Sequence, residues 1–131
     1  MSLPVELDTV EGAAQLYDWF GYWPDFHDAE IISLHLNRQR SSSLFIHTWD
    51  LTKNVDDSGY YVCTKHVVVE FLLESISQLA LTGFSNQNVI FGLDIAKTNS
   101  GFRLTLHECY GLAGQIEVGK LSIRFAPGKP Q

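Results

Sequence analysis

The spacing of apolar residues along this chain changes once, close to residue 20. Before that point, apolar side chains recur every three or four positions, which is typical of one face of an amphipathic α-helix. These residues are Val10, Ala13, Leu16, Tyr17 and Phe20. Asp8 or Thr9 can cap the start of the helix, and Gly21 is a natural residue after its end. The pattern therefore predicts one helix over about residues 9–20, and Pro24 prevents it from continuing.

After the helix, apolar and polar residues alternate with a period of two, as in β-strands that bury one face. The clearest stretch is YYVCTKHVVVEFLLE, at residues 60–74. Its predicted inward side chains are Val67, Val69, Phe71 and Leu73, with His66, Glu70 and Glu74 outside. The earlier stretch SLFIHTWDL has the same alternation, with Leu44, Ile46 and Thr48 on one face and Phe45, His47 and Trp49 on the other.

Turn residues divide this β region at several places. TKNVDDSG, at residues 52–59, is the most loop-like segment, and Asn99-Ser100-Gly101 predicts a hairpin in which the glycine accepts a positive φ. The segments between turns amount to about seven or eight antiparallel strands over residues 28–125, followed by a tail at residues 126–131. The predicted fold is a single α+β domain over residues 1–131, mainly antiparallel β, with the N-terminal helix packed on a curved sheet or sandwich.

Composition limits the class of protein. With 131 residues, 45% of them apolar, the chain can bury one good core. It contains no apolar run of the ~18 residues needed to span a membrane, and no basic start followed by an apolar stretch that would act as a secretory signal. We therefore expect a cytoplasmic protein. In that compartment Cys63 and Cys109 are expected to be buried free thiols, although a disulfide between them stays open.

The net charge of −6 is concentrated at the N-terminus. Residues 1–30 contain seven acids and no lysine or arginine, whereas the other 101 residues contain eight acids and nine bases. A surface of this sign attracts basic partners and repels nucleic acid and anionic membranes. The alternative interpretation is a solvated helix face that only keeps the protein soluble.

The segment YWPDFHDAEI, at residues 22–31, places an imidazole among carboxylates just before the first predicted strand. His27 and Asp28, joined by His47 and Asp50 from the next strand, are residue types that bind zinc or non-haem iron. Their spacing matches no strong metal motif such as HExxH. The structural alternative is that Asp28 accepts backbone N–H groups at a corner while His27 bridges helix and sheet.

Catalytic arrangements have little support in the sequence. There is no GxSxG nucleophile motif, and the glycine-containing loops lack the spacing and the basic residue of a phosphate-binding loop. Asp28 and Glu30 could share one face of a strand as paired carboxylates about 7 Å apart, but this spacing is unspecific. We therefore predict a protein that is not an enzyme and that uses no cofactor.

Aromatic residues gather in the same part of the chain as the acids. They are Tyr17, Trp19, Phe20, Tyr22, Trp23 and Phe26. Tyr and Trp beside carboxylates are typical of a surface that binds a basic protein. The alternative is that these rings seal the end of the sheet, and the sequence leaves both interpretations open.

Four stretches resemble the immunity protein 50 family of bacterial polymorphic-toxin systems: LYDWFGYWPDFHDAEIISLHLNR, TKHVVVEFLLE, GFSNQNVIFGLDI and LHECYGLAG. The resemblance runs from about Gly12 to Phe125, and WPDFHDAE is its most specific part. Similar sequences usually have serine at the position of Asp25, so the resemblance does not imply a site role for Asp25. The resemblance implies a small cytosolic protein that binds and neutralises a toxin domain, and it implies no catalytic residues.

The charge pattern and the resemblance together define the expected partner. It is a cognate protein toxin with a basic surface, rather than nucleic acid or a membrane, and a homodimer stays open. The residues expected to face the toxin are Asp18, Trp19, Trp23, Asp28 and Glu30. The alternative function is a metal- or small-ligand-binding β domain that uses His27, Asp28, His47 and Asp50.

Overall fold

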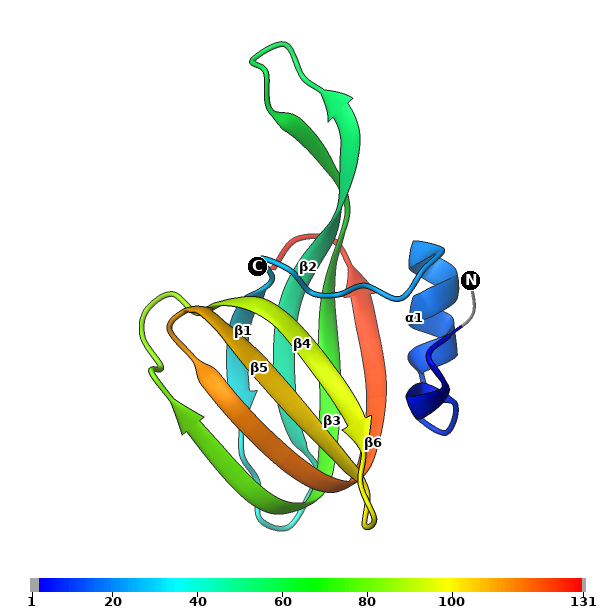
Figure 1. The fold of residues 1–131 in the computed structure, drawn as a ribbon, viewed down its shortest axis with the longest axis vertical. Helices are drawn as coiled ribbons and strands as arrows, with labels where there is room; N and C mark the ends of the chain where they lie inside the picture. Colours follow the sequence, from blue (N-terminus) through cyan, green and yellow to red (C-terminus); the bar gives the residue numbers. More distant parts are fainter. Residues whose placement is uncertain (1–2, 131) are drawn as a thin grey trace.

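Six antiparallel strands close into a barrel in the computed structural model, which describes residues 3–130 apart from the side chains of residues 51–53 and 61 (Figure 1). The strands are β1 (Glu30–His35), β2 (Ser42–Val55), β3 (Tyr61–Thr82), β4 (Val89–Lys97), β5 (Phe102–Tyr110) and β6 (Ala113–Pro127). Their order around the barrel is β1-β2-β3-β6-β5-β4. The predicted class, α+β and mainly antiparallel β with one N-terminal helix, is confirmed.

The predicted number of strands is too high. Residues 75–82 count as a separate strand in the predicted total, but they continue β3 without a break, so that β3 runs from Tyr61 to Thr82. β3 bends where Ser75 takes a φ of 56° and where the register with β6 shifts between Ile76 and Gln78. A bulge of this kind turns a long strand without ending it, and the bend lets β3 pair first with β2 and then with β6 alone.

The predicted helix exists but is shorter than expected. α1 spans Ala13–Phe20, after a 3-10 turn at Val5–Leu7. Its N-cap is Gly12, with a φ of 91° and no capping side chain, so the prediction that Asp8 or Thr9 caps it is wrong. The reason is tertiary, because residues 11–12 lie against β6 and the Ile123 N–H donates to the Glu11 carbonyl at 2.7 Å.

The end of the helix and its buried face agree with the sequence pattern. The N–H of Gly21, at a φ of 85°, donates to the Tyr17 carbonyl and ends α1 in the expected left-handed cap. Ala13, Leu16 and Phe20 are buried. Figure 1 shows α1 lying beside β6, outside the barrel. No described helix has the length and apolar character needed to cross a membrane.

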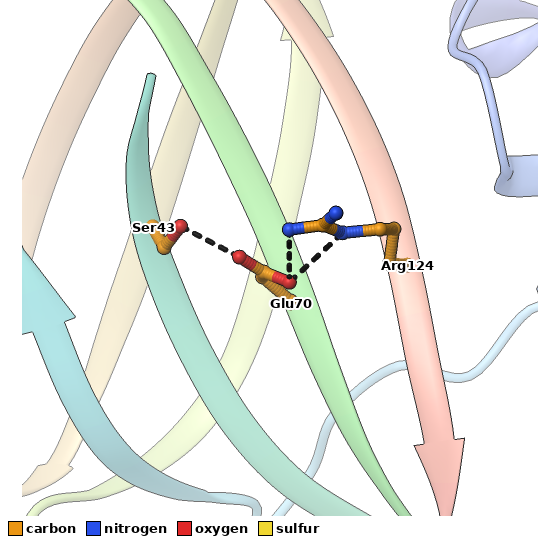
Figure 2. Close-up of polar contacts among 3 residues, drawn as sticks. All are labelled: Ser43, Glu70 and Arg124. Atoms are coloured by element: carbon orange, nitrogen blue, oxygen red, sulfur yellow. Dashed lines mark hydrogen bonds and ion pairs between the residues drawn. The ribbon is translucent and has the colours of Figure 1, made fainter. Parts of the chain in front are cut away.

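Alternation along the strands fills the barrel as predicted. Val67, Val69, Phe71 and Leu73 of β3 are buried, as are Leu44, Ile46 and Thr48 of β2. Every strand contributes apolar side chains to this core. On the outer surface, Glu70 ties three strands together (Figure 2). Its carboxylate accepts from the Ser43 hydroxyl of β2 at 2.7 Å and from the Arg124 guanidinium of β6 at 2.9 and 3.0 Å.

Beyond the barrel, β2 and β3 continue as a two-stranded arm, drawn in green at the top of Figure 1. Half of the predicted loop at residues 52–59 is therefore strand, because β2 continues to Val55, and the turn itself covers residues 56–60. Asp56 organises that turn, because its carboxylate accepts the N–H groups of Ser58 and Tyr60. Among the described side chains of the arm, Val55 and Tyr60 are 56% and 72% exposed, so this part of the chain has no simple buried pattern.

Both cysteines are exposed and free, so the prediction of buried thiols is wrong. Cys63 lies in the arm, opposite residue 51, and Cys109 lies near the end of β5. Cys63 does lie in a β-strand, as its β-rich surroundings predict, but this part of β3 extends beyond the barrel core.

The predicted β4–β5 hairpin is confirmed, although its glycine acts differently. The Thr98 N–H donates to the Gly101 carbonyl at 2.9 Å. Gly101 does not have a positive φ. A Cβ at this position would instead lie 2.0 Å from the Val118 carbonyl oxygen, so glycine is required by the close approach of β6.

Candidate functional site

The segment from Gly21 to Ala29, here called the corner segment, connects α1 to β1 and passes across the barrel strands (Figure 1). Backbone hydrogen bonds fasten it to β4, from the Asp28 N–H to the Ile90 carbonyl and from the Leu93 N–H to the Asp25 carbonyl. Phe26 anchors it from below. Its ring is 1% exposed and lies 5.7 Å from the ring of Phe71 in the core.

The corner segment has an unusual backbone. Phe26 and Asp28 have φ values of 61° and 63°, in the left-handed region that non-glycine residues rarely adopt. Such conformations cost about 1–3 kcal/mol each and persist where the surrounding structure holds them. Here the buried Phe26 ring and the hydrogen bonds to β4 hold the segment, and consequently Asp25, His27 and Asp28 are exposed.

Two hollows flank the corner segment. The first, here called the β4 hollow, has a volume of about 570 Å³. It is lined by Pro4, Leu7, Trp23, Pro24, Asp25, His27, residues 91–95 and His107. In it the His107 Nε2 lies 2.6 Å from the Asp94 Oδ2, and the His27 ring meets the Phe91 ring edge to face at 4.8 Å.

The second hollow, here called the β2 hollow, has a volume of about 390 Å³. It is lined by Tyr22, Trp23, Asp25, His27, Asp28, Trp49 and Asp50. The Tyr22 hydroxyl donates to the Asp50 Oδ1 at 2.6 Å. Burial raises the pKa of Tyr22, and the hydrogen bond to Asp50 raises it further, so this phenol is a firm donor at neutral pH. Trp23, Asp25 and His27 line both hollows and form the wall between them.

Carboxylates dominate the charge of this surface. Asp25, Asp28, Asp50 and Asp94 line one hollow or both, and the described lining residues include no lysine or arginine. Imidazoles contact two of these carboxylates, with the His27 Nδ1 3.2 Å from the Asp28 Oδ2 and the His107 Nε2 2.6 Å from the Asp94 Oδ2. The surface therefore combines negative charge with the faces of Trp23 and Trp49, a combination that favours a cationic group of a partner.

A pair of histidines lies where the arm leaves the barrel. The His47 Nε2 and the His66 Nδ1 are 3.0 Å apart, their rings are stacked at 23°, and Trp49 packs beside them. Burial lowers the pKa of both histidines, and the positive charge of Lys129 lowers both further. His66 also lowers the pKa of His47. Glu30 acts in the opposite direction on the pKa of His47.

The histidine pair predicts a stability that depends on pH. The unfolded chain takes up protons on these histidines near their ordinary pKa of 6.5, and the folded chain takes them up only at lower pH. The folded state is therefore most favoured above that value, and its free energy of unfolding is expected to fall as the pH drops through the lowered folded pKa values. Urea unfolding at pH 7.5 and at lower pH measures this.

A double variant separates the pair from other titrating groups. In His47→Gln with His66→Gln, the part of the pH dependence that begins near pH 6.5 should disappear. In His35→Gln, a change at an exposed histidine of β1, it should remain. An unchanged pH profile in the double variant would show that the pair does not couple protonation to folding.

With the geometry described, comparisons with known proteins identify the family. A family model described as immunity protein 50 matches residues 12–124. The chain belongs to the immunity protein 50 family. Membership implies a toxin as partner. No curated protein and no solved structure matches the chain.

Only part of the predicted toxin-facing set lies at the hollows of this immunity protein 50 member. Trp23 and Asp28 line them, and Glu30 is the half-buried first residue of β1, opposite His47. Asp18 and Trp19 lie on α1 and line neither hollow. Asp18 is exposed there.

Trp19 has a structural environment of its own on α1. Its ring contacts those of Phe20 and Phe125, and the Lys65 amine lies 5.9 Å from its centre. The same amine donates to the Trp19 and Phe20 carbonyls, where a helix C-terminus favours a cation. Together with the burial of Phe20 and Phe26, this shows that much of the aromatic cluster seals the barrel and its helix.

The four residues of the metal hypothesis do not form a ligand set. His27, Asp28 and Asp50 reach the β2 hollow, but His47 pairs with His66 and Asp50 accepts from Tyr22. Within the described part of the chain, no group of three or more His, Cys, Asp or Glu side chains is arranged to hold a metal ion. The structure therefore does not favour the metal hypothesis, because the two hydrogen bonds engage the ligands elsewhere.

Sequence reasoning missed the β4 and β5 contributions to the surface. Asp94 and His107 lie on adjacent strands, whose register pairs Gly92 with His107 and Asp94 with Thr105. Nothing in the spacing of Asp94 and His107 along the chain signals that diagonal contact. Phe91 gave no signal either, because a period of two groups it with Leu93 and Ile95, whereas the register shift between Ile90 and Gly92 leaves its ring exposed.

Proposed function

We propose that this protein is a non-catalytic, cytoplasmic immunity protein that binds a cognate toxin domain and blocks it by covering its working surface. The observation that carries the proposal is the family match over residues 12–124. The structure supports a mode of binding, in which the two hollows and the corner segment between them face the toxin.

The charge of this surface suits a basic partner. A toxin that acts on nucleic acid needs cationic side chains where it contacts phosphate. Asp25, Asp28, Asp50 and Asp94 offer carboxylates to such groups, while Trp23 and Trp49 offer ring faces. Opposite charges also accelerate the encounter of the two proteins, which benefits an antidote that must act before damage occurs.

The first experiment tests the function itself. The product of the adjacent gene is expressed with and without the protein, and growth of the host is measured. We expect growth to be restored only in the presence of the protein, and the two purified proteins to form a stable complex. Failure of both would contradict the proposed function.

The second experiment tests the binding surface by removing charge without changing shape. In Asp25→Asn with Asp28→Asn, the amide oxygen introduced at position 25 can still accept the His27 N–H, as the Asp25 Oδ1 does at 2.9 Å. We expect the toxin dissociation constant to rise roughly tenfold to hundredfold, chiefly through slower association that depends on salt.

Matched variants locate the surface. Glu11→Gln with Glu108→Gln removes the same charge at exposed positions outside both hollows, and it should leave the dissociation constant nearly unchanged. Asp18→Ala with Trp19→Ala tests the helix side, because both residues lie on α1. If only this double variant weakens binding, the toxin contacts α1 and the hollows are not the interface.

A further inference from the structure

The barrel has an open seam along β1. Between β1 and β4 the described ladder contains one residue pair, Glu30 with Val89, supported by the hydrogen bond from the Ile31 N–H to the Asn88 carbonyl. Past this point β1 pairs only with β2. On the other side of the opening, β3 beyond Leu73 pairs only with β6. Two strand edges therefore border the same opening.

The opening is lined by apolar side chains. Its upper part is a groove of about 470 Å³, lined by residues 32–34, residues 81–84 and Leu112. A second hollow of about 370 Å³, lined by residues 36–38, Ser42, Ile76 and Leu79, lies past the end of β1. Four large apolar side chains of this lining are 40–71% exposed, and a group of this kind is typical of an interaction surface: Ile32, Leu36, Leu79 and Phe84.

The seam lacks two of the usual protections of a strand edge. Lysines and prolines commonly prevent an exposed edge from pairing with another chain, and the described lining of the seam contains neither. A strand edge beside an apolar groove is suited to an extended peptide, whose backbone adds to the sheet while alternate side chains enter the groove. Its occupant therefore has extended backbone and apolar side chains.

Position and charge indicate which protein supplies that peptide. The seam begins at Glu30, where the corner segment ends, so it is continuous with the proposed toxin-facing surface. Arg38 is the only charged residue among the described lining residues of the seam, and it lies at the far end from Glu30. A segment bound in the seam is therefore expected to carry an acidic residue that pairs with Arg38.

We propose that an extended segment of the toxin adds to the edge of β1 in the open seam, with apolar side chains in the groove and an acidic residue near Arg38. This inference rests on the proposed function and names the form of the partner. The acidic hollows then attract and orient the toxin, while the seam supplies apolar area that is buried in the complex.

Hydrogen exchange of the backbone tests the pairing directly. The toxin domain identified by the growth experiment, purified in a catalytically inactivated form, is mixed with the full chain, and amide exchange is compared with that of the free protein. We expect residues 32–36 and 76–82 to become at least tenfold more protected in the complex. Protection confined to the corner segment would overturn the inference and leave the proposed function standing.

Variants give a second measurement. Ile32→Lys with Phe84→Lys introduces charge into the groove at positions that are 40% and 71% exposed. It should raise the toxin dissociation constant at least tenfold, with an unchanged melting temperature. Val55→Lys with Tyr60→Lys makes the same chemical change at exposed residues of the arm, outside the seam, and should have little effect.

The remaining outcomes are also decisive. If the wild-type chain does not bind the toxin, both the proposed function and this inference fail. If the free protein is a dimer in solution and the seam variant makes it monomeric, a second copy of this chain occupies the seam. That result would overturn the assignment to the toxin.

Discussion

Replacing Phe26 by alanine is expected to lower the free energy of unfolding by roughly 3–5 kcal/mol. The ring is 1% exposed and contacts Phe71 and Trp23, with ring centres at 5.7 and 6.2 Å. Its removal leaves a cavity beneath the corner segment, and the strained φ of 61° at this residue loses the packing that holds it. Chemical denaturation at neutral pH measures the loss.

The same substitution should also loosen the binding surface. Phe26 is the buried anchor between Asp25 and His27, which line both hollows. We expect the amides of residues 25–31 to exchange faster in Phe26→Ala. Phe91→Ala is the matched control, because Phe91 is 58% exposed and its loss should change stability by only about 0.5 kcal/mol. Equal effects of the two substitutions would show that Phe26 does not anchor the segment.

Substitution of Gly12 by alanine is expected to be similarly damaging, at roughly 2–5 kcal/mol in total from backbone strain and overpacking. A left-handed conformation costs an alanine about 1–2 kcal/mol, and Gly12 has a φ of 91°. An added Cβ would also lie 1.9 Å from the Ile123 carbonyl oxygen. Overpacking of this kind costs about 1–3 kcal/mol more, because α1 must move away from β6.

Gly21→Ala isolates the contribution of that contact. Gly21 ends the same helix at a φ of 85°, but no described atom lies within 4 Å of the position that an added Cβ would take. The Gly21→Ala substitution should therefore lower the free energy of unfolding only through backbone strain, by about 1–2 kcal/mol. Melting and denaturant curves of the two variants measure the difference. If Gly21→Ala is as damaging as Gly12→Ala, the close approach of α1 to β6 is not important for stability.

Local patterns predicted the parts of this protein that depend on local geometry. The buried faces of α1, β2 and β3 followed from the periods of 3.6 and 2, because a side chain's direction is set by its own backbone. Gly21 was predicted as the helix end for the same reason. The start of the helix was not, since Gly12 is selected by its contact with Ile123, far away in the sequence.

The candidate site was predicted only where the sequence kept its residues together. Trp23, Asp28 and their neighbours were identified because they lie in one short segment of unusual composition. Asp94 and His107 were not, because a diagonal contact across two strands depends on register. His47 was assigned to a metal set, yet its ring lies 3.0 Å from that of His66, because the register pairs His47 with Val68 and makes His66 its diagonal neighbour.

By itself, the sequence determined the class of fold, the inward faces of its elements, the acidic N-terminal segment and the family to which the chain belongs. Only the tertiary structure decided that six strands close into a barrel, that Cys63 and Cys109 are exposed, and that two hollows and an open seam adjoin the corner segment. The physical reason is that residue spacing encodes the direction of each side chain. The choice of neighbouring strand and register is made by packing between distant segments.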